Sequence, residues 1–596
     1  EALKRAYTLL RRVEHAAQAL QDKQTHDYPH EALARERMAG NLGYESASLL
    51  EAELQQQRDI VAALFAKVIA DPKQEGAATV DEEWRQLWVG NLDRDKASEL
   101  LASQGYLEPE AVLDALDQYR AGRQYLAMDA ISRTRMERFI PQLLIRLGQE
   151  AQPDFGFRRV FEFVQAVARR TVYLVLLLEN PLALSQLIML CSASPWILEL
   201  LSRYPVLLDE LLRPLAEPPE KRVLQDRLHQ ALLRSSGSDL DEQLVTIQNF
   251  KQEQVLIVAA AELSGTLPLM KVSDSLTWIA EVVLERILDM AWEQLLRKYG
   301  KPFNADGECD RRDFLIIAYG KLGGIELSYG SDLDLVFMHN GHADLDTTGG
   351  ENGATVNSGA FYVRLGQKVL SLLNTHTVAG KLYDIDLRLR PSGASGALVC
   401  TPEAFHLYQR DHAWTWEHQA LIRTRAVAGE AAVETLFLAI RSEVLAQQRS
   451  EWKLASDIVS MRARMRKELG TRKALDLFHL KQDPGGLVDI EFIVQFLVLA
   501  NAHRYSDLLQ WSDNMRLLDL IASHDLLPAD EAQALQQTYI AYRGHLHKRA
   551  LDNADYRLAG DAFVQEREAV VRIWAKLFAG IEPGPLHEGS GGPEAS

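Results

Sequence analysis

The chain has 596 residues, of which 47% are hydrophobic and 25% are charged, and its formal net charge at pH 7 is −18. This is the composition of ordinary globular proteins, and the length allows roughly three to five domains. The strong negative charge argues against a nucleic-acid substrate, because a polyanionic partner normally requires a basic protein face.

The N-terminal residues already have the pattern of an amphipathic helix, and no signal peptide is visible. A helix in progress without an initiating Met indicates a fragment or a processed chain. The three cysteines, Cys191, Cys309 and Cys400, are far apart and contain no C-x-x-C pair, so neither a disulfide framework nor a zinc site is predicted. These features together predict a cytoplasmic protein.

Two segments near the ends of the chain share a pattern. Residues 3, 7, 11 and 15 are Leu, Tyr, Arg and His, and the same types recur in order at 535, 539, 543 and 547. The four-residue step places each set on one helix face. A second block follows each set in the same order: Arg58, Val61, Ala66, Lys67 and Ala70 against Arg567, Val570, Ala575, Lys576 and Ala579. We therefore expect an internal repeat.

Residues from about 96 to 300 are predicted to be helical throughout. The segment 276–288 has the clearest helical spacing of apolar residues. A cluster of prolines between 205 and 219 marks a loop and a subdomain joint. The most apolar stretch, 172–201, is interrupted by Pro181 and Pro195, so it predicts a pair of buried helices rather than a membrane span.

A glycine-rich turn followed by two acids is the most informative segment, AYGKLGGIELSYGSDLDLVF at 318–337. Side chains alternate along a strand, so Asp332 and Asp334 point the same way while Leu333 and Leu335 point into the core. Two carboxylates side by side repel each other unless a cation lies between them, and a divalent metal is the usual solution. The glycines allow a phosphate to approach the backbone, and a helix beginning just after them would aim free N–H groups at it.

Each part of this segment has an ordinary structural explanation when taken alone. An Asp-x-Asp pair is common at strand ends, and a Gly-Gly turn is nearly uninformative. Their joint occurrence in a compact unit of strand (314–319), glycine turn, short helix and acidic strand is far more specific. It favours a site that binds metal and nucleotide and transfers a nucleotidyl group.

A second acidic segment follows at 381–393, KLYDIDLRLRPSG, and it alternates strictly from residue 383. A strand here would place Asp384, Asp386, Arg388 and Arg390 on one face. Ordinary cross-strand salt bridges on a solvated face are one interpretation. Alternatively, if this strand pairs with the first acidic strand, one of its acids completes a trio of metal ligands, and its arginines meet phosphate oxygens.

Further helices are predicted at 404–425, 430–448, 451–470 and from 485 onward. Asp489 and Glu491 are two residues apart and do not share a helix face, so we interpret them as helix-start acids favoured by the dipole. His545 and His547 diverge on a helix for the same reason and are expected on a solvated surface. The Gly-, Ser- and Pro-rich end is a flexible tail by composition.

The segments GKLGGIELSYGSDLDLVF, LYDIDLRLRPSG and KQDPGGLVDIEFIVQFLVL resemble the glutamine synthetase adenylyltransferases, within the DNA polymerase β-type nucleotidyltransferase superfamily. The resemblance covers essentially the whole chain except its last dozen residues. In that family the first half removes AMP and the second half adds it. The Tyr329-Gly330-Ser331 version of the motif looks like the second, adenylylating copy.

The resemblance implies transfer of AMP from ATP to a tyrosine of glutamine synthetase, with release of pyrophosphate and control of nitrogen assimilation. It implies that Mg²⁺ or Mn²⁺ is held by Asp332, Asp334 and Asp386, the last being preferred because it matches the lone strand Asp of the family. The nucleotide phosphates would meet groups drawn from Lys321, Gly323, Gly324, Ser331, Arg388 and Arg390. A PII signalling protein is an implied partner and glutamine an implied effector, with neither nucleic acid nor membrane involved.

The predicted fold is mostly α, with one α/β nucleotidyltransferase domain flanked by helical bundles. We expect a helical tail of a missing first catalytic half at 1–95, so that the AMP-removing site is absent from this chain. A helical regulatory region follows at 96–300, the catalytic domain at 301–400, a helical bundle at 401–582 and a flexible tail at 583–596. Two alternatives stay open, namely a uridylyltransferase of a PII protein and a non-catalytic scaffold that binds PII or glutamine synthetase.

Overall fold

The computed structural model describes residues 9, 12–13, 16, 29, 31–57, 82–214, 217–235, 239–308, 310–342, 344–471 and 477–584. The chain divides into two compact units, 1–87 and 88–596. In the first unit α2 spans Ala32–Leu42 and ends at Gly43, whose left-handed conformation suits a helix C-terminus. The N-terminal copy of the predicted repeat, the predicted tail from residue 585 and Cys309 lie outside the described residues.

The part of the second unit that precedes the sheet is helical, as predicted. Its helices are α4 (Glu82–Val89), which begins in the first unit, α5 (Arg94–Gln104), α6 (Pro109–Ala121), α7 (Arg123–Leu126), α8 (Ala130–Leu147), α9 (Pro153–Val167), α10 (Val172–Glu179), α11 (Pro181–Ala193), α12 (Pro195–Arg203), η1 (Pro205–Leu212), α13 (Lys221–Arg234), α14 (Leu240–Leu263) and α15 (Leu269–Tyr299). Prolines begin α6, α9, α11, α12 and η1, because the first helical position needs no N–H and favours a fixed φ.

The apolar stretch at 172–201 forms α10, α11 and α12. Among the described residues no single helix is long and apolar enough to cross a membrane. The pair α10 and α11 reaches the required length and composition only together, and the two helices are bent by 109° at Asn180. Leu174, Leu177 and Leu187 from this pair are fully buried in the protein.

A small mixed sheet stands at the centre of the second unit. Its strands are β1 (Phe314–Ala318), β2 (Leu333–His339), β3 (Ile385–Asp386), β4 (Val399–Cys400) and β5 (Arg425–Gly429). The order is β3-β2-β1-β5, and β4 also pairs with β2. β1 is antiparallel to both β2 and β5, whereas β2 is parallel to β3 and β4. The short helix α16 (Gly320–Gly323) links β1 to the loop before β2, and α17 (Ser358–Asn374) and η2 (Gly393–Ser395) lie between later strands.

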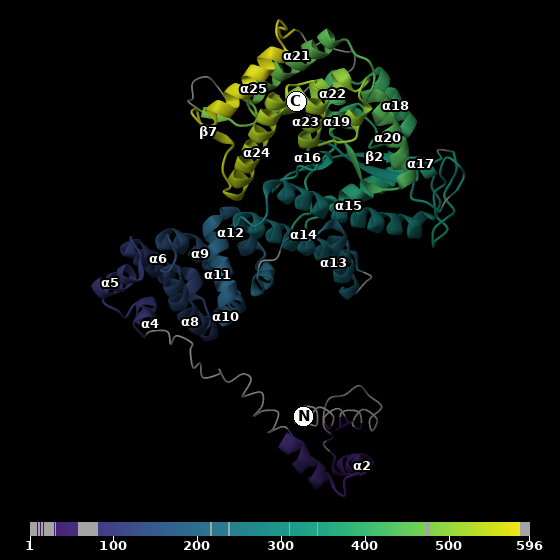
Figure 1. The fold of residues 1–596 in the computed structure, drawn as a ribbon. Coiled ribbons are helices and arrows are strands. Elements are labelled where there is room, and N and C mark those ends of the chain that lie inside the picture. Colours follow the sequence, from purple (N-terminus) through teal and green to yellow (C-terminus); the bar gives the residue numbers. More distant parts are fainter. Residues whose placement is uncertain are drawn as a thin grey trace. The chain divides into compact units, whose positions relative to one another are not determined.

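Helices cover both faces of this sheet, which explains why β1 is buried at every residue. On one face α15 and α17 pack together, and the ring of Phe314 stacks on Tyr362 at 6.4 Å. On the other face Leu315 and Ile317 of β1 join a hydrophobic core made mainly by the C-terminal helices. Figure 1 shows the teal sheet between α15 and these green and yellow helices.

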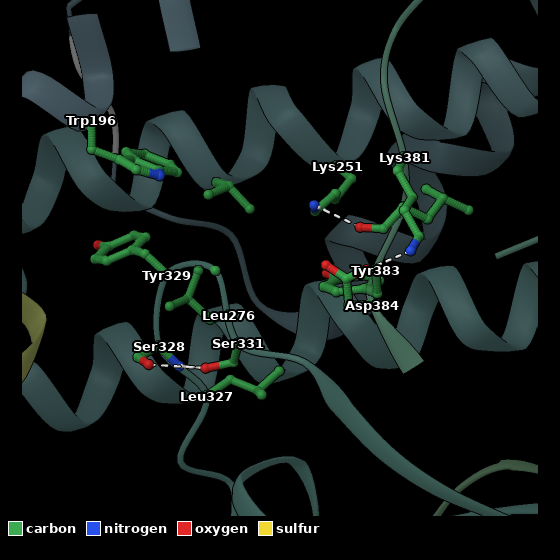
Figure 2. A pocket seen from close by; sticks show the side chains of 13 residues that line it. Trp196, Lys251, Leu276, Leu327, Ser328, Tyr329, Ser331, Lys381, Tyr383 and Asp384 are labelled. Atoms are coloured by element: carbon green, nitrogen blue, oxygen red, sulfur yellow. Dashed lines mark hydrogen bonds and ion pairs between the residues drawn. The ribbon is translucent and has the colours of Figure 1, made fainter. Parts of the chain in front are cut away.

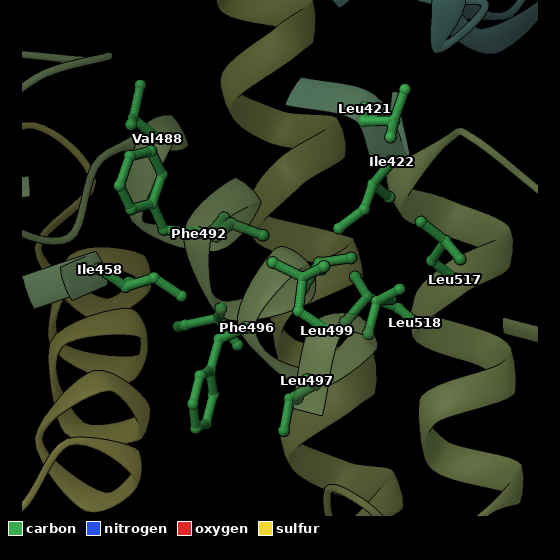
Figure 3. Packing of buried hydrophobic residues seen from close by; sticks show 14 of the residues in the cluster. Leu421, Ile422, Ile458, Val488, Phe492, Phe496, Leu497, Leu499, Leu517 and Leu518 are labelled. Atoms are coloured by element: carbon green, nitrogen blue, oxygen red, sulfur yellow. The ribbon is translucent and has the colours of Figure 1, made fainter. Parts of the chain in front are cut away.

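The C-terminal helices form a bundle around α22 (Leu487–Asn501), which is buried along nearly its whole length. Its neighbours in the core include Ile458, Leu421, Ile422, Leu517 and Leu518 (Figure 3). The surrounding elements are α18 (Pro402–Asp411), α19 (Thr415–Ile422), α20 (Ala431–Leu445), α21 (Glu451–Leu469), η3 (Ser506–Leu509), α23 (Asn514–Ser523), α24 (Ala529–Leu551), α25 (Val564–Leu577) and the two-stranded ribbon of β6 (Leu477–His479) and β7 (Arg557–Ala559).

Four local predictions are wrong. The predicted helix at 404–425 is two helices, and it is followed by β5, a strand that was not predicted. The predicted strand at 381–390 shrinks to β3, because residues 388–391 turn away. The short helix starts before the Gly323-Gly324 pair and not after it. His547 was expected in solvent but is 1% exposed, packed between Glu262 and the ring of Tyr329.

Candidate active site

The acids of the two acidic segments meet at the start of β2. In the parallel ladder Asp334 is the direct partner of Asp386, and the amide of Leu333 donates to the carbonyl of Asp384 at 2.9 Å. Asp332 immediately precedes β2 and is exposed, whereas Asp334 is half-buried. The structure therefore brings Asp332, Asp334 and Asp386 together, with Asp332 and Asp334 one alternation apart.

The electrostatics of this group show an excess of negative charge around Asp334. Burial, and then repulsion by Asp332 and Asp386, raise the pKa of Asp334 to about 6, although Lys321 and Arg388 act in the opposite direction. Hydrogen bonds from Arg388 hold the pKa of Asp386 below its ordinary value. The side chain of Arg388 donates to both oxygens of this carboxylate, with its Nε 2.8 Å from Oδ2.

Within the described part of the chain, no three His, Cys, Asp or Glu side chains are gathered closely enough to hold a metal as they stand. The carboxylate of Asp386 is turned onto Arg388 instead. Even so, the set fits a divalent cation. All the donors are hard carboxylate oxygens, and a cation would relieve the repulsion at Asp334. The Arg388 side chain is 83% exposed, so its ion pair with Asp386 is a weak competitor.

Ser331, on the loop that leads into β2, and Lys321, on α16, lie beside the acids. Lys321 Nζ donates to Ser331 Oγ at 3.2 Å. The same hydroxyl is 2.9 Å from Ser328 Oγ and accepts from the Ser328 amide at 3.2 Å. The loop is thus a tight turn, with Gly330 in the left-handed region at φ 67°. The hydroxyls of Ser328 and Ser331 and the ammonium of Lys321 therefore lie together next to the carboxylates.

Gly323 and Gly324 are used for packing. Both amides donate inside α16, to Tyr319 O and Gly320 O at 3.0 Å, so neither N–H points outward. A Cβ on Gly323 would collide with the carbonyl oxygen of Arg423. The glycine that borders the acids is Gly320, which the sequence analysis did not select. It has φ 57°, and a Cβ there would collide with the carboxylate of Asp334.

Arg388 and Arg390 differ in what they contact. Arg388 holds Asp386 and lines the open cleft at the acids. Arg390 donates instead to three carbonyl oxygens of its own turn, those of Leu387, Ala394 and Gly396, at 2.9–3.3 Å. The structure therefore places Arg388 at the acids and Arg390 in the support of the turn.

Three hollows lie in this region: two cavities bordered by the loop Leu327–Ser331, and an open cleft at the acids. The larger of the two cavities, called the large cavity, has a volume of about 250 Å³, and Figure 2 shows Trp196 and Tyr329 on one side of it and Lys251, Lys381 and Asp384 on the other. The open cleft, about 380 Å³, exposes Asp332, Asp386 and Arg388. The small cavity, about 40 Å³, lies toward the C-terminal bundle. Its lining includes Lys321, Lys481, Glu491, Arg543 and His547.

A buried ionic cluster joins this loop to the helices around it. Glu326, 3% exposed, pairs with Arg423 and accepts from the hydroxyl of Tyr539 at 2.6 Å. Arg423 also pairs with Glu491 of α22 at 2.5 Å. Although burial opposes it, Arg423 and Arg543 hold the pKa of Glu326 below its ordinary value. The cluster fixes the loop before β2 against the C-terminal bundle.

The sequence did not predict the positions that several further residues take at the site. Asp489 is indeed in the first turn of its helix, but it is fully buried and is held by Arg462 and Arg466 at 2.6 Å each. Glu491 lines the small cavity. Lys251 lines the large cavity, and burial lowers its pKa to about 8. No local sequence pattern marks these roles, because each partner is far away along the chain.

Comparisons with known proteins give one consistent result. Residues 184–440 match the family model of glutamate-ammonia ligase adenylyltransferase. Residues 1–69 and 457–568 match that of GlnD PII-uridylyltransferase. Two separate segments are therefore similar to one family, and the repeat predicted from the sequence falls largely within them.

Curated relatives match along almost the whole chain. The bifunctional glutamine synthetase adenylyltransferase/adenylyl-removing enzyme of Pseudomonas aeruginosa is 43% identical over an alignment of 598 positions, which covers 97% of this chain and 61% of that protein. The enzymes of the same name from Hahella chejuensis and Nitrosococcus oceani are each 42% identical over 97% of this chain and 60% of theirs. The chain thus spans about three fifths of the length of the curated relatives it matches.

Proposed function

The chain belongs to the glutamate-ammonia ligase adenylyltransferase family, and we propose that it transfers AMP from ATP to a tyrosine hydroxyl of glutamine synthetase, releasing pyrophosphate. One structural observation carries the proposal. The parallel pairing of β2 and β3 sets Asp334 beside Asp386, with Asp332 adjacent, inside the segment that matches the adenylyltransferase model. Such a set of acids on neighbouring strands suits nucleotidyl transfer.

In the proposed reaction the phenol oxygen forms a bond to the α-phosphorus of ATP. The bond from that phosphorus to the bridging oxygen breaks, and pyrophosphate leaves with the electron pair while the phenol proton passes to solvent. A free phenol has a pKa near ~10, so its oxygen needs activation at neutral pH. Mg²⁺ or Mn²⁺ held by Asp332, Asp334 and Asp386 would supply positive charge at the reacting phosphate.

The chain itself supplies groups that hold the nucleotide. Lys321 Nζ and the hydroxyls of Ser328 and Ser331 are within one hydrogen-bonded group beside the acids, where they can donate to phosphate oxygens. Arg388 can exchange the carboxylate of Asp386 for a phosphate, because the pair is exposed to solvent.

Glutamine synthetase is the proposed protein substrate, because the relatives carry it in their names. Modification of that enzyme would control nitrogen assimilation. The similarity of residues 457–568 to a PII-uridylyltransferase supports a PII signalling protein as partner. Glutamine is proposed as effector from the family resemblance alone.

The direct test is incubation of the chain with labelled ATP, Mg²⁺ and unmodified glutamine synthetase. We expect Asp332→Asn and Asp386→Asn each to abolish AMP incorporation. The matched control is Asp411→Asn, an exposed aspartate of α18 that is paired with Arg410 and lines none of the three hollows. Retained transfer in the first two variants, or equal loss in the control, would refute the assignment of the acids.

A second candidate function is uridylyl transfer to a PII protein, favoured by the match of residues 457–568. Replacing labelled ATP by labelled UTP, and glutamine synthetase by a PII protein, separates the two. Labelling only in the UTP reaction would favour this candidate. The remaining alternative, a non-catalytic scaffold, requires that the chain fail to bind ATP in a metal-dependent manner.

A further inference from the structure

We propose that Lys481, together with Lys321, binds the terminal phosphate of the nucleotide, and the corresponding end of the pyrophosphate formed from it, at the small cavity between the loop Leu327–Ser331 and the C-terminal bundle. The proposal rests on the proposed nucleotidyl transfer, which it extends by assigning a site for the leaving group. Lys481 lies between β6 and α22, far along the chain from Asp332, Asp334 and Asp386.

The two lysines enter the small cavity from different parts of the fold. Lys321 belongs to α16, directly before the loop, and Lys481 precedes the first turn of α22. Lys481 Nζ is 4.1 Å from the centroid of the Tyr556 ring, which also lines the cavity. Neither lysine forms an ion pair with any residue that the structure describes.

The charges around the cavity leave a surplus of positive charge. Its two acids, Glu326 and Glu491, are both paired with the buried Arg423. Lys321, Lys481 and Arg543 contribute cations. Burial, and then repulsion by Lys321, lower the pKa of Lys481 to about 8, which is the reverse of what a lysine with a counter-ion shows. A bound polyanion would remove this repulsion.

A buried donor without a hydrogen bond also belongs to a residue that lines the cavity. Arg543 Nη1 is buried and makes no hydrogen bond, although the carboxylate of Glu326 lies 3.7 Å away. The Arg543 side chain is only 5% exposed. Buried donors are normally satisfied, so this unmet donor beside a cavity indicates a place for an acceptor. Phosphate oxygens are strong acceptors for such groups.

The size of the small cavity agrees with this assignment. Its volume of about 40 Å³ exceeds the ~10–15 Å³ that one water requires, so it admits oxygens of one phosphate but no base. Ser328 lines both the small and the large cavity, and Ser331 holds Lys321 next to Asp332. The small cavity therefore borders the loop that leads into the acids at which the α-phosphate would react.

The test is a calorimetric titration of the full chain with pyrophosphate in the presence of Mg²⁺, and with AMP. We expect Lys481→Met to weaken pyrophosphate binding about tenfold or more, as loss of a charge-assisted hydrogen bond requires, while AMP binding stays unchanged. Lys481→Arg should retain most of the affinity. The matched control is Lys453→Met, an exposed lysine of α21 that lines none of the three hollows.

Kinetics give a second readout. The KM for ATP should rise about tenfold or more in Lys481→Met, and the apparent inhibition by added pyrophosphate should weaken in parallel. Lys481→Gln replaces Lys481→Met if the latter does not show the wild-type unfolding temperature. Wild-type affinity for pyrophosphate in a folded Lys481 variant would overturn the proposal, as would an equal loss in Lys453→Met. If the wild type instead binds pyrophosphate through Lys481 but transfers no AMP, the proposed function fails and this site stands.

Discussion

Replacing Asp334 by Asn should abolish AMP transfer and, without divalent metal, stabilise the fold. The carboxylate of Asp334 has a pKa of about 6 against an ordinary 3.8, because it is half-buried and lies beside Asp332 and Asp386. A difference of about 2 pKa units corresponds to about 3 kcal/mol of unfavourable free energy once the group is ionised. The amide of Asn is nearly isosteric and carries no charge, so we expect a gain of about 1–3 kcal/mol near pH 7.5.

The raised pKa of Asp334 fixes the direction in which the stability changes with pH. The folded state holds the Asp334 proton more tightly than the unfolded state, so the wild-type free energy of unfolding falls as pH rises from about 4 to 6. Below this window the carboxyl is protonated in both states and the variant has no advantage. Above it the full cost is present, and the difference between the two proteins is constant.

Denaturant unfolding followed by tryptophan fluorescence in EDTA, at pH 5.0, 6.0 and 7.5, measures this difference. Asp411→Asn is again the control, because its carboxylate is exposed and salt-bridged to Arg410. Addition of Mg²⁺ should stabilise the wild type but not Asp334→Asn, and so reduce the difference in their free energies of unfolding. The account of uncompensated charge would be refuted if Asp334→Asn were less stable than wild type at pH 7.5. It would also be refuted if the difference in free energy of unfolding between the two proteins did not change with pH.

Three further outcomes are expected. Gly323→Ala should lower the free energy of unfolding by about 1–3 kcal/mol, because its Cβ meets the Arg423 carbonyl; Gly544→Ala, with no atom nearer than 3.8 Å, should not destabilise in the same melts. Glu326→Ala should cost about 3–5 kcal/mol in denaturant unfolding, since the buried Arg423 loses one of its two acids and the hydroxyl of Tyr539 loses its acceptor; a cost below 1 kcal/mol would contradict the role of the cluster. Finally, this chain should not release labelled AMP from modified glutamine synthetase in phosphate, because the described residues contain one sheet with paired acids; rapid release would disprove this.

The parts of the site that alternate along one strand were predictable from the sequence. The pattern around Asp332 and Asp334 requires a strand with an apolar and an acidic face, and β2 has it. At 381–390 the same alternation predicted a strand that is longer than the one observed, β3. Both the amide and the side chain of Arg388 bind Asp386, at 2.8 Å for the amide, so the chain turns directly after β3. An alternating sequence does not reveal that two of its own members will pair.

Features that depend on distant partners were not predictable. β5 has the sequence Arg-Ala-Val-Ala-Gly, whose alanines favour helix, and it becomes a strand only because β1 offers a free edge. His547 was judged by its spacing from His545, yet contacts with Glu262 and Tyr329 decide its burial. Lys481 and Arg423 have no local signature at all. Each acquires its role through residues far away along the chain, such as Glu326 and Glu491, which lie 97 and 68 positions from Arg423.

The place of β5 in the sheet constrains how this enzyme family can be dissected or recombined. β1 lies between β2 and β5, and the segment of β5 follows two helices that belong to the C-terminal bundle. A polypeptide cut at residue 400 would leave one edge of β1 unpaired and the apolar side chains of Leu315 and Ile317 uncovered, inviting aggregation. Any chimera that transplants the acids of β2 and β3 into a relative therefore has to carry the chain through Gly429, together with the helices that cover it.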